Sequence, residues 1–189
     1  MKGWVFVVSS PSGGGKTTVV ERLRRTIPRL ARSVSVTTRP PRRGERQGRA
    51  YHFVSPAAFQ RLRRAGQLLE WARVHGASYG TPKRPVMQAV AEGKSVVLSI
   101  DVQGARQVRR ALGARAVLIF LLPPSLASLR QRLVRRRTDT SSAIRRRLAA
   151  AKRELRCAAW YDFRVVNDRL DQAISEVQAI VKAQQALSR

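Results

Sequence analysis

The chain has 189 residues, which fits one domain with a substantial core, and its 43% hydrophobic content argues against extensive disorder. No apolar run approaches the roughly 20 residues that span a bilayer, and the apolar stretch near the N-terminus is too short for the core of a signal peptide. A single cysteine, Cys157, excludes an internal disulfide within the chain. These features predict a cytoplasmic protein that does not contact the membrane.

The formal charge of +27 is the unusual feature of the composition. Only six of the 38 basic residues are lysines, and the arginines are scattered in pairs and triplets along the chain. One interpretation is a nucleic-acid surface, because a strong positive field attracts phosphates without reading sequence. The other is a general use of arginine combined with small anionic substrates. The scatter favours the second interpretation, so we expect no specific nucleic-acid partner.

In chain order, the first predicted element is a buried strand at 4–8, followed by a polar, glycine-rich loop. A helix then begins, with Val19, Val20, Leu23 and Ile27 on one face, and Pro28 ends it. Further apolar runs at 95–100, 116–122 and 163–166 are separated by helical patterns, and the last helix has the clearest apolar stripe. Alternating strands and helices predict an α/β fold with a parallel sheet covered on both faces.

Two stretches interrupt this alternation. Residues 33–80 read as short polar strands at 33–38, 51–55 and 68–72, with a helix that Ser55 caps and Pro56 opens. This pattern predicts a small antiparallel subdomain inserted into the core. The stretch 135–142 is charged and lacks apolar positions, as expected for a mobile lid.

The loop between the first strand and the first helix has the context of a phosphate-binding P-loop. Glycines let backbone N–H groups turn toward phosphate oxygens, and the N-terminus of the following helix favours negative charge. Lys16 is placed to reach the β- and γ-phosphates of ATP, and the Thr17 hydroxyl to bind Mg²⁺. The loop has Ser10 where the general pattern has its first glycine. The residues expected to bind ATP are Ser10, Pro11, Ser12, Gly13, Gly14, Gly15, Lys16 and Thr17.

The segment after this helix indicates which family of P-loop proteins the chain resembles. Residues 33–45 follow the pattern S-x-S-x-T-T-R-x-P-R-x-G-E, and residues 48–54 follow G-x-x-Y-x-F-V. Here the chain closely resembles the guanylate kinase family. Further matches in the family's order lie at 69–72, 79–82, 100–105, 123–125 and 165–168, so that the resemblance covers nearly the whole chain.

The resemblance implies a single domain with a five-stranded parallel sheet of the P-loop NTPase type and flanking helices. The core would comprise residues 1–32, 83–134 and 151–189. An insert at about 33–82 would bind GMP, and a short arginine-rich lid would occupy about 135–150.

The resemblance also implies roles for individual residues. Those expected to hold the GMP phosphate are Arg39, Arg42, Tyr51 and Tyr79, and those expected to contact guanine are Ser35, Glu70, Thr81 and Asp101. Two guanidinium groups and two phenols suit a phosphate dianion. Glu70 lies in an otherwise apolar run, where a carboxylate needs a partner or a purpose, and guanine offers N1–H and an amine side by side. A structural salt bridge to an arginine is the alternative interpretation of Glu70.

In the lid, Arg136 and Arg147 occupy family positions that are directed at the phosphates being exchanged. With Lys16 and Arg39 they are the expected catalytic residues. Three residues depart from the family pattern: Arg135 and Arg137 stand where relatives usually have glycine, and Ser99 stands where they usually have an acid. An arginine at a position that needs positive φ would be strained.

The resemblance thus implies a nucleoside monophosphate kinase that supplies guanine nucleotides by moving the γ-phosphoryl group of ATP to GMP, with Mg²⁺ as cofactor and dGMP use left open. A monomer and a homo-oligomer both fit the sequence. Three alternatives stay open: another small-substrate kinase such as a ribose bisphosphate kinase, a non-catalytic guanylate-kinase-like binding module, and a nucleic-acid-binding protein. The intact segment 39–51 argues against the first, and Lys16 with Thr17 argues against the second.

Overall fold

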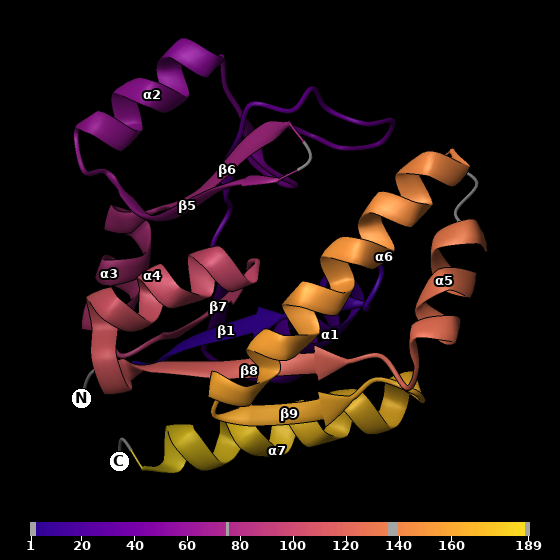
Figure 1. The fold of residues 1–189 in the computed structure, drawn as a ribbon. Helices are drawn as coiled ribbons and strands as arrows, with labels where there is room; N and C mark the ends of the chain where they lie inside the picture. The colour runs from indigo at the N-terminus through magenta and orange to yellow at the C-terminus, as the bar shows by residue number, and fades with distance from the viewer. Residues whose placement is uncertain (1–2, 75, 136–139, 188–189) are drawn as a thin grey trace.

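A five-stranded parallel sheet forms the centre of the protein in the computed structural model, which describes residues 3–74, 76–135 and 140–187. Its strand order is β2-β7-β1-β8-β9, and β1 pairs with both β7 and β8. Figure 1 labels four of these strands, β7, β1, β8 and β9. The strands are β1 (Val5–Ser9), β2 (Leu30–Arg32), β7 (Ser95–Ser99), β8 (Ala116–Leu122) and β9 (Phe163–Val166). The predicted α/β class with five parallel strands is confirmed.

Helices cover both faces of this sheet, because its strands are apolar on both sides. Phe6 and Val8 face α1 (Lys16–Thr26) and α7 (Leu170–Ala186). Their neighbours Val5 and Val7 face the opposite way, toward α3 (Lys83–Ala91) and α4 (Val102–Leu112). The remaining core elements are η1 (Gly113–Arg115), α5 (Leu126–Arg135), α6 (Ser141–Arg156) and η2 (Cys157–Trp160). The sheet is therefore packed between two apolar layers, one on each face.

The insert forms a second, four-stranded sheet in the order β4-β3-β6-β5, above the core sheet in Figure 1. Its elements are β3 (Val36–Thr37), β4 (His52–Phe53), α2 (Pro56–Arg64), β5 (Leu68–Val74) and β6 (Ala77–Pro82). The Ser55 Oγ accepts a hydrogen bond from the Ala58 N–H, and Pro56 opens α2, as predicted. The prediction of an antiparallel subdomain is wrong in one respect, since β3 and β4 pair in parallel. The long connection between them, which holds the arginine-rich motif, permits this direction.

The predicted lid lies around the connection between α5 and α6. α5 ends at Arg135, and α6 begins at Ser141, where the Thr140 Oγ1 accepts a hydrogen bond from the Ala143 N–H. Arg136 and Arg137 lie outside the described residues. The boundaries expected for the core, insert and lid stay a prediction.

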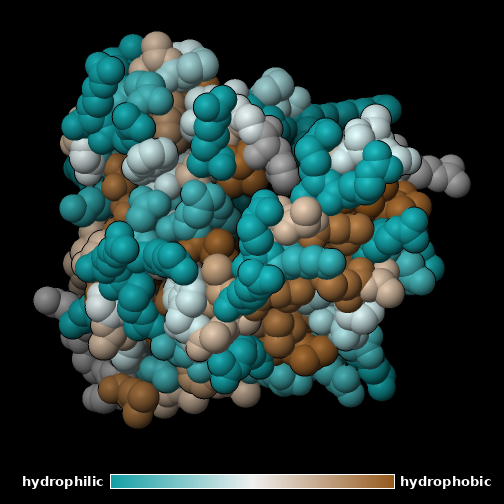
Figure 2. Space-filling model, viewed as in Figure 1, coloured by the Kyte–Doolittle hydropathy of each residue, from teal (hydrophilic) through white to brown (hydrophobic). Residues whose placement is uncertain are grey.

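Figure 2 shows hydrophilic side chains spread over the whole visible face, from the insert to the helices of the core, with apolar side chains gathered between α5 and α6. Hydrophilic residues are thus distributed over this face and do not form one isolated patch on it. No helix among the described residues is long and apolar enough to cross a membrane.

Candidate active site

A cavity of about 210 Å³ opens where β1 and β7 end, between the core and the insert. In an open parallel sheet, this carboxyl edge is where ligands bind. The lining residues come from the P-loop, both strand ends, the insert and α6: Ser10, Ser12, Lys16, Ser35, Tyr51, Glu70, Ala72, Val74, Tyr79, Ser99, Ile100, Asp101 and Glu154. The fold therefore gathers eight of the predicted site residues around one space.

The P-loop has the backbone that its glycines predict. Gly13 and Gly15 adopt φ of +90° and +94°, a region that side chains disfavour, and Gly15 is the N-cap of α1. The Gly14 N–H donates to the Pro11 carbonyl at 2.9 Å, which closes a tight turn. This glycine-rich turn thus leads directly into the N-terminal end of α1, the arrangement that binds phosphate.

Ser10, the departure from the general pattern, fits this loop. Its side chain is buried, and its Oγ donates to the Pro11 carbonyl at 3.0 Å. A Cβ at Gly14 would lie 2.5 Å from the Ser10 Oγ, so the absence of a side chain at Gly14 leaves room for the Ser10 side chain. The Lys16 Nζ donates to the Ser10 carbonyl and lies 3.3 Å from the Ser10 Oγ. Lys16 is thereby held along the loop and lines the cavity.

Asn167 directly follows β9 and forms a hydrogen bond to the P-loop, a role that we did not predict from the sequence. Its Nδ2 donates to the Gly14 carbonyl at 2.8 Å, and its own carbonyl accepts from Arg132 at 2.8 Å. A Cβ at Gly15 would clash with the Asn167 amide. The motif at 165–168 marked this residue, but only the fold shows that it packs on the phosphate loop.

Glu70 is the buried anion of the site, with a relative exposure of 3%. It lies on β5 opposite Thr81 of β6, whose hydroxyl donates to Oε1 at 2.6 Å. Burial raises the pKa of Glu70 to about 7, and nearby Asp101 adds to the effect, while Thr81 opposes it. No arginine is paired with Glu70 among the described ion pairs. The structural salt bridge that was the alternative interpretation is therefore not among the ion pairs of residues 3–74, 76–135 and 140–187.

Tyr51 and Tyr79 line the cavity, and Arg39 lies beside Tyr51 outside the lining. The two phenol rings pack edge to face with centroids 5.9 Å apart, and the Arg39 guanidinium lies 5.6 Å from the Tyr51 centroid. Glu45 holds Arg39 with both oxygens, at 2.8 and 2.9 Å, and accepts from the Arg42 N–H. Glu45 belongs to the predicted motif, but its positioning of Arg39 emerges only from the structure.

Of the remaining predicted site residues, some line the cavity and others lie outside it. Asp101 lines the cavity and caps α4, accepting from the backbone N–H groups of Gln103 and Gly104. Thr81 is buried behind Glu70, and Arg42 is exposed outside the lining. Thr17, on the first turn of α1, is exposed.

The α6 helix contributes a residue that the sequence interpretation missed. Glu154 lines the cavity together with Ser12, Lys16 and Asp101. Burial raises the pKa of Glu154, although the charge of Lys16 draws it down. Arg147 lies seven residues earlier on α6, hence on the same face of the helix as Glu154, and is half-buried. Arg136 lies outside the described residues.

Comparison with known proteins agrees with this geometry. The family model described as guanylate kinase matches residues 2–184. The chain is 51% identical to a guanylate kinase of Oleidesulfovibrio alaskensis, over 94% of this chain and 85% of that protein, and 48% identical to one of Rhizobium etli, over 97% and 83%. A crystal structure of guanylate kinase from Anaplasma phagocytophilum superposes with a TM-score of 0.83 at 35% identity, covering 97% of this chain and 87% of that one. The chain belongs to the guanylate kinase family.

Proposed function

We propose that the cavity between the P-loop and the insert is the place where this kinase transfers the γ-phosphoryl group of ATP to GMP, giving ADP and GDP. Lys16 and the loop 10–17 would bind the ATP phosphates. Arg39, Arg42, Tyr51 and Tyr79 would bind the GMP phosphate. Closure of the insert and lid would exclude water and align the acceptor oxygen with the γ-phosphorus.

The catalysis that we propose needs no general base. Phosphoryl transfer is accelerated mainly by positioning and by neutralising the charge of the phosphates. Lys16, Arg39, Arg136 and Arg147 would supply this positive charge. Glu45 holds the Arg39 guanidinium with both carboxylate oxygens, and this pairing would orient the guanidinium for the GMP phosphate.

Mg²⁺ is the cofactor that we propose, and the donor set fits it. Groups of three or more Asp, Glu, His or Cys side chains that could hold a metal are absent from the described part of the chain. Mg²⁺ commonly keeps several waters and binds one or two protein oxygens together with substrate phosphates. The exposed Thr17 hydroxyl beside Lys16 is the oxygen that we expect to bind it. When bound, the ion would neutralise charge on the ATP phosphates.

Glu70 carries the choice of guanine in this proposal. Its buried carboxylate opens on the cavity, and one oxygen is already fixed by the Thr81 hydroxyl. An ionised carboxylate only accepts hydrogen bonds, so it suits the N1–H and amine of guanine, whereas adenine would present a lone pair at N1. Each hydrogen bond to a charged group contributes roughly 1.5–3 kcal/mol, which makes discrimination of several decades feasible. Ser35, Thr81 and Asp101 would complete the guanine contacts.

The test is an ADP-release assay with GMP, dGMP, AMP, CMP and UMP. Glu70→Gln keeps the shape but puts a donor where guanine also donates. We expect kcat/KM for GMP to fall by about two decades or more, with AMP unchanged or slightly better and ATP affinity little altered. Glu176→Gln, on the exposed face of α7, is the matched control and should behave as wild type. Full preference for GMP in Glu70→Gln would show that guanine is read elsewhere.

We also propose that the protein works in the cytoplasm on free nucleotides. Its single cysteine suits a reducing compartment. The distributed arginines would attract polynucleotides only weakly and without sequence preference.

A further inference from the structure

A second cavity lies on the seam between the core and the insert. It has a volume of about 810 Å³. Its charged lining residues are Glu21 and Arg24 of α1, Arg32 of β2, and Arg46 and Arg49 of the insert. We call this cavity the seam pocket. Four arginines against one glutamate make it strongly positive, and none of them belongs to the proposed active site.

The core side of the seam pocket holds two guanidinium groups together. The Glu21 carboxylate accepts a hydrogen bond from Arg32 at 2.7 Å and lies 3.5 Å from the Arg24 guanidinium. Arg32 also reaches across to the insert, where it donates to the Ala50 carbonyl at 3.3 Å. One carboxylate therefore gathers two cations and leaves an excess of positive charge at the seam.

The insert side adds two more cations from a single turn of chain. The N–H groups of Arg49 and Ala50 both donate to the Arg46 carbonyl, at 3.1 and 3.0 Å. Both arginines are exposed and line the pocket. Among the described lining residues Glu21 is the sole carboxylate, and it already serves Arg24 and Arg32. The charge of Arg46 and Arg49 is thus left to a ligand or to solvent.

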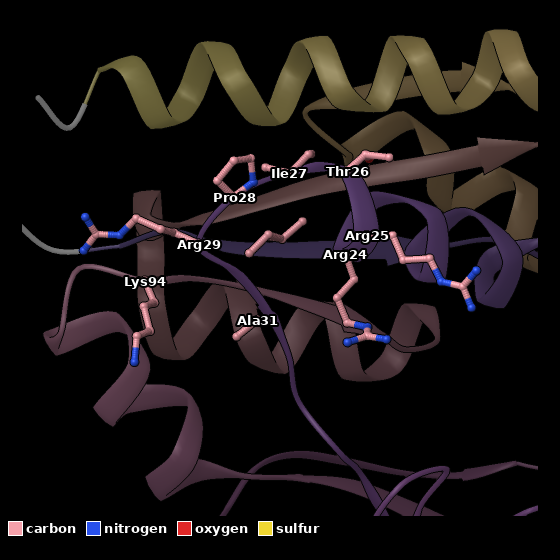
Figure 3. A pocket seen from close by; sticks show the side chains of 9 residues that line it. Arg24, Arg25, Thr26, Ile27, Pro28, Arg29, Ala31 and Lys94 are labelled. Atoms are coloured by element: carbon pink, nitrogen blue, oxygen red, sulfur yellow. The ribbon is translucent and has the colours of Figure 1, made fainter.

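A neighbouring cavity of about 460 Å³ is also basic but is arranged differently. Figure 3 shows Arg24, Arg25, Arg29 and Lys94 pointing away from one another around it. Lys94 is also paired with Glu92 at 2.8 Å. Because these cationic ends diverge, they do not favour one compact anion.

The seam pocket has the size and chemistry of a small-molecule site. Its volume lies in the range of ligand pockets, roughly 300–1,000 Å³. Guanidinium groups bind phosphate oxygens in pairs, and several of them together suit more than one phosphate. We propose that the seam pocket binds a small compound with two or more phosphate groups, and that the bound anion weakens GMP binding.

The expected antagonism follows from the position of the pocket. The loop 44–50 lies between Arg42 and Tyr51, and the charge of Arg32 acts on the Tyr51 phenol, whose pKa it lowers against the larger effect of burial. A multivalent anion at the seam offsets this positive field, which the GMP phosphate would otherwise experience. This coupling rests on the proposed GMP site, whereas binding at the seam does not.

The binding test uses calorimetric titration with inorganic tripolyphosphate at about 150 mM salt, where weak surface attraction is largely screened. Saturating GMP and a non-hydrolysable ATP analogue occupy the active site. We expect one saturable site in wild type and at least tenfold weaker binding in Arg46→Gln/Arg49→Gln. The control pair Arg61→Gln/Arg64→Gln removes equal charge from exposed positions of α2 and should stay within twofold of wild type. A parallel titration with CTP shows whether a nucleoside adds to the affinity of the phosphate chain.

Absence of a saturable site in wild type, or an equal loss in both variant pairs, would overturn the site. The coupling is read from KM for GMP with and without tripolyphosphate. We expect KM to rise at least twofold in wild type and in the control pair, and much less in Arg46→Gln/Arg49→Gln. An equal rise in all three proteins would mean that tripolyphosphate acts at the active site, and an unchanged KM in wild type would overturn the antagonism.

Discussion

Replacing Glu70 with glutamine measures how much the buried carboxylate of the active-site cavity lowers the free energy of unfolding. Burial moves the pKa of Glu70 from its ordinary 4.5 to about 7. At 1.36 kcal/mol for each pH unit, this difference corresponds to about 3 kcal/mol between the ionised forms in the folded and unfolded chain. Glutamine still accepts from the Thr81 hydroxyl but has no charge to desolvate.

The effect depends on pH in a defined direction. Below pH 4.5 both folded and unfolded chains carry a protonated Glu70, so its ionisation costs nothing. Between about 4.5 and 7 the folded chain holds more protons than the unfolded one, and the free energy of unfolding falls as pH rises. Above pH 7 the free energy of unfolding has fallen by the full amount that Glu70 contributes. Glu70→Gln should therefore exceed wild type by about 3 kcal/mol at pH 8, and by about 1 kcal/mol at pH 5.

Urea unfolding of both proteins at pH 5 and pH 8 measures this gap, and thermal melting should show a higher Tm for the variant at pH 8, by several degrees for a chain of this length. Glu176→Gln, an exposed carboxylate on α7, controls for loss of charge alone. A variant no more stable than wild type at pH 8, or a gap that does not change with pH, would refute the reasoning. The same substitution is expected to lose guanine selectivity, so stability and function would move in opposite directions.

Other predictions concern the reaction. Because only ionised Glu70 accepts from both guanine donors, kcat/KM for GMP should rise about tenfold from pH 6 to pH 8 in wild type, and less in Glu70→Gln. Lys16→Met should lower kcat by at least about two decades with unchanged circular dichroism; wild-type turnover would remove its role. Arg136→Ala and Arg147→Ala should each lower kcat more than they raise either KM, and the reverse pattern would contradict a transition-state role. Binding to DNA or RNA should be lost as the salt concentration rises from low values to about 200 mM. A titration that finds sequence-selective binding at about 200 mM salt would contradict this prediction.

The sequence predicted four of the five core strands, because each is an apolar run long enough to recognise. β2 was missed, since its three residues end in Arg32 and become a strand only by pairing with β7. β6 was missed for a related reason. Its Gly80 has little strand preference, and it packs against Leu68 and Glu70 of β5 and Phe59 of α2.

The site was predictable where a motif specifies chemistry and unpredictable where distant segments meet. The P-loop was predicted from a local pattern, and the roles of Glu70 and the two tyrosines from the resemblance to guanylate kinases; the cavity brings them together. Asn167 and Glu154 act on the P-loop from β9 and α6, more than 130 positions away along the chain, so no local pattern indicates their partners. Glu45 was visible in the motif, but its hold on Arg39 depends on the folded turn.

Gly104 illustrates how the insert and the core are fitted to each other. It lies in the first turn of α4, where glycine is about 1 kcal/mol less favourable than alanine and no positive φ requires it. A Cβ there would clash with the Glu70 Oε2, so the glycine leaves room for the carboxylate of β5. Asp101, the N-cap of the same helix, adds its charge to the environment that raises the pKa of Glu70. One helix turn of the core thus sets both the space and the electrostatics of the residue that we propose reads guanine from the insert.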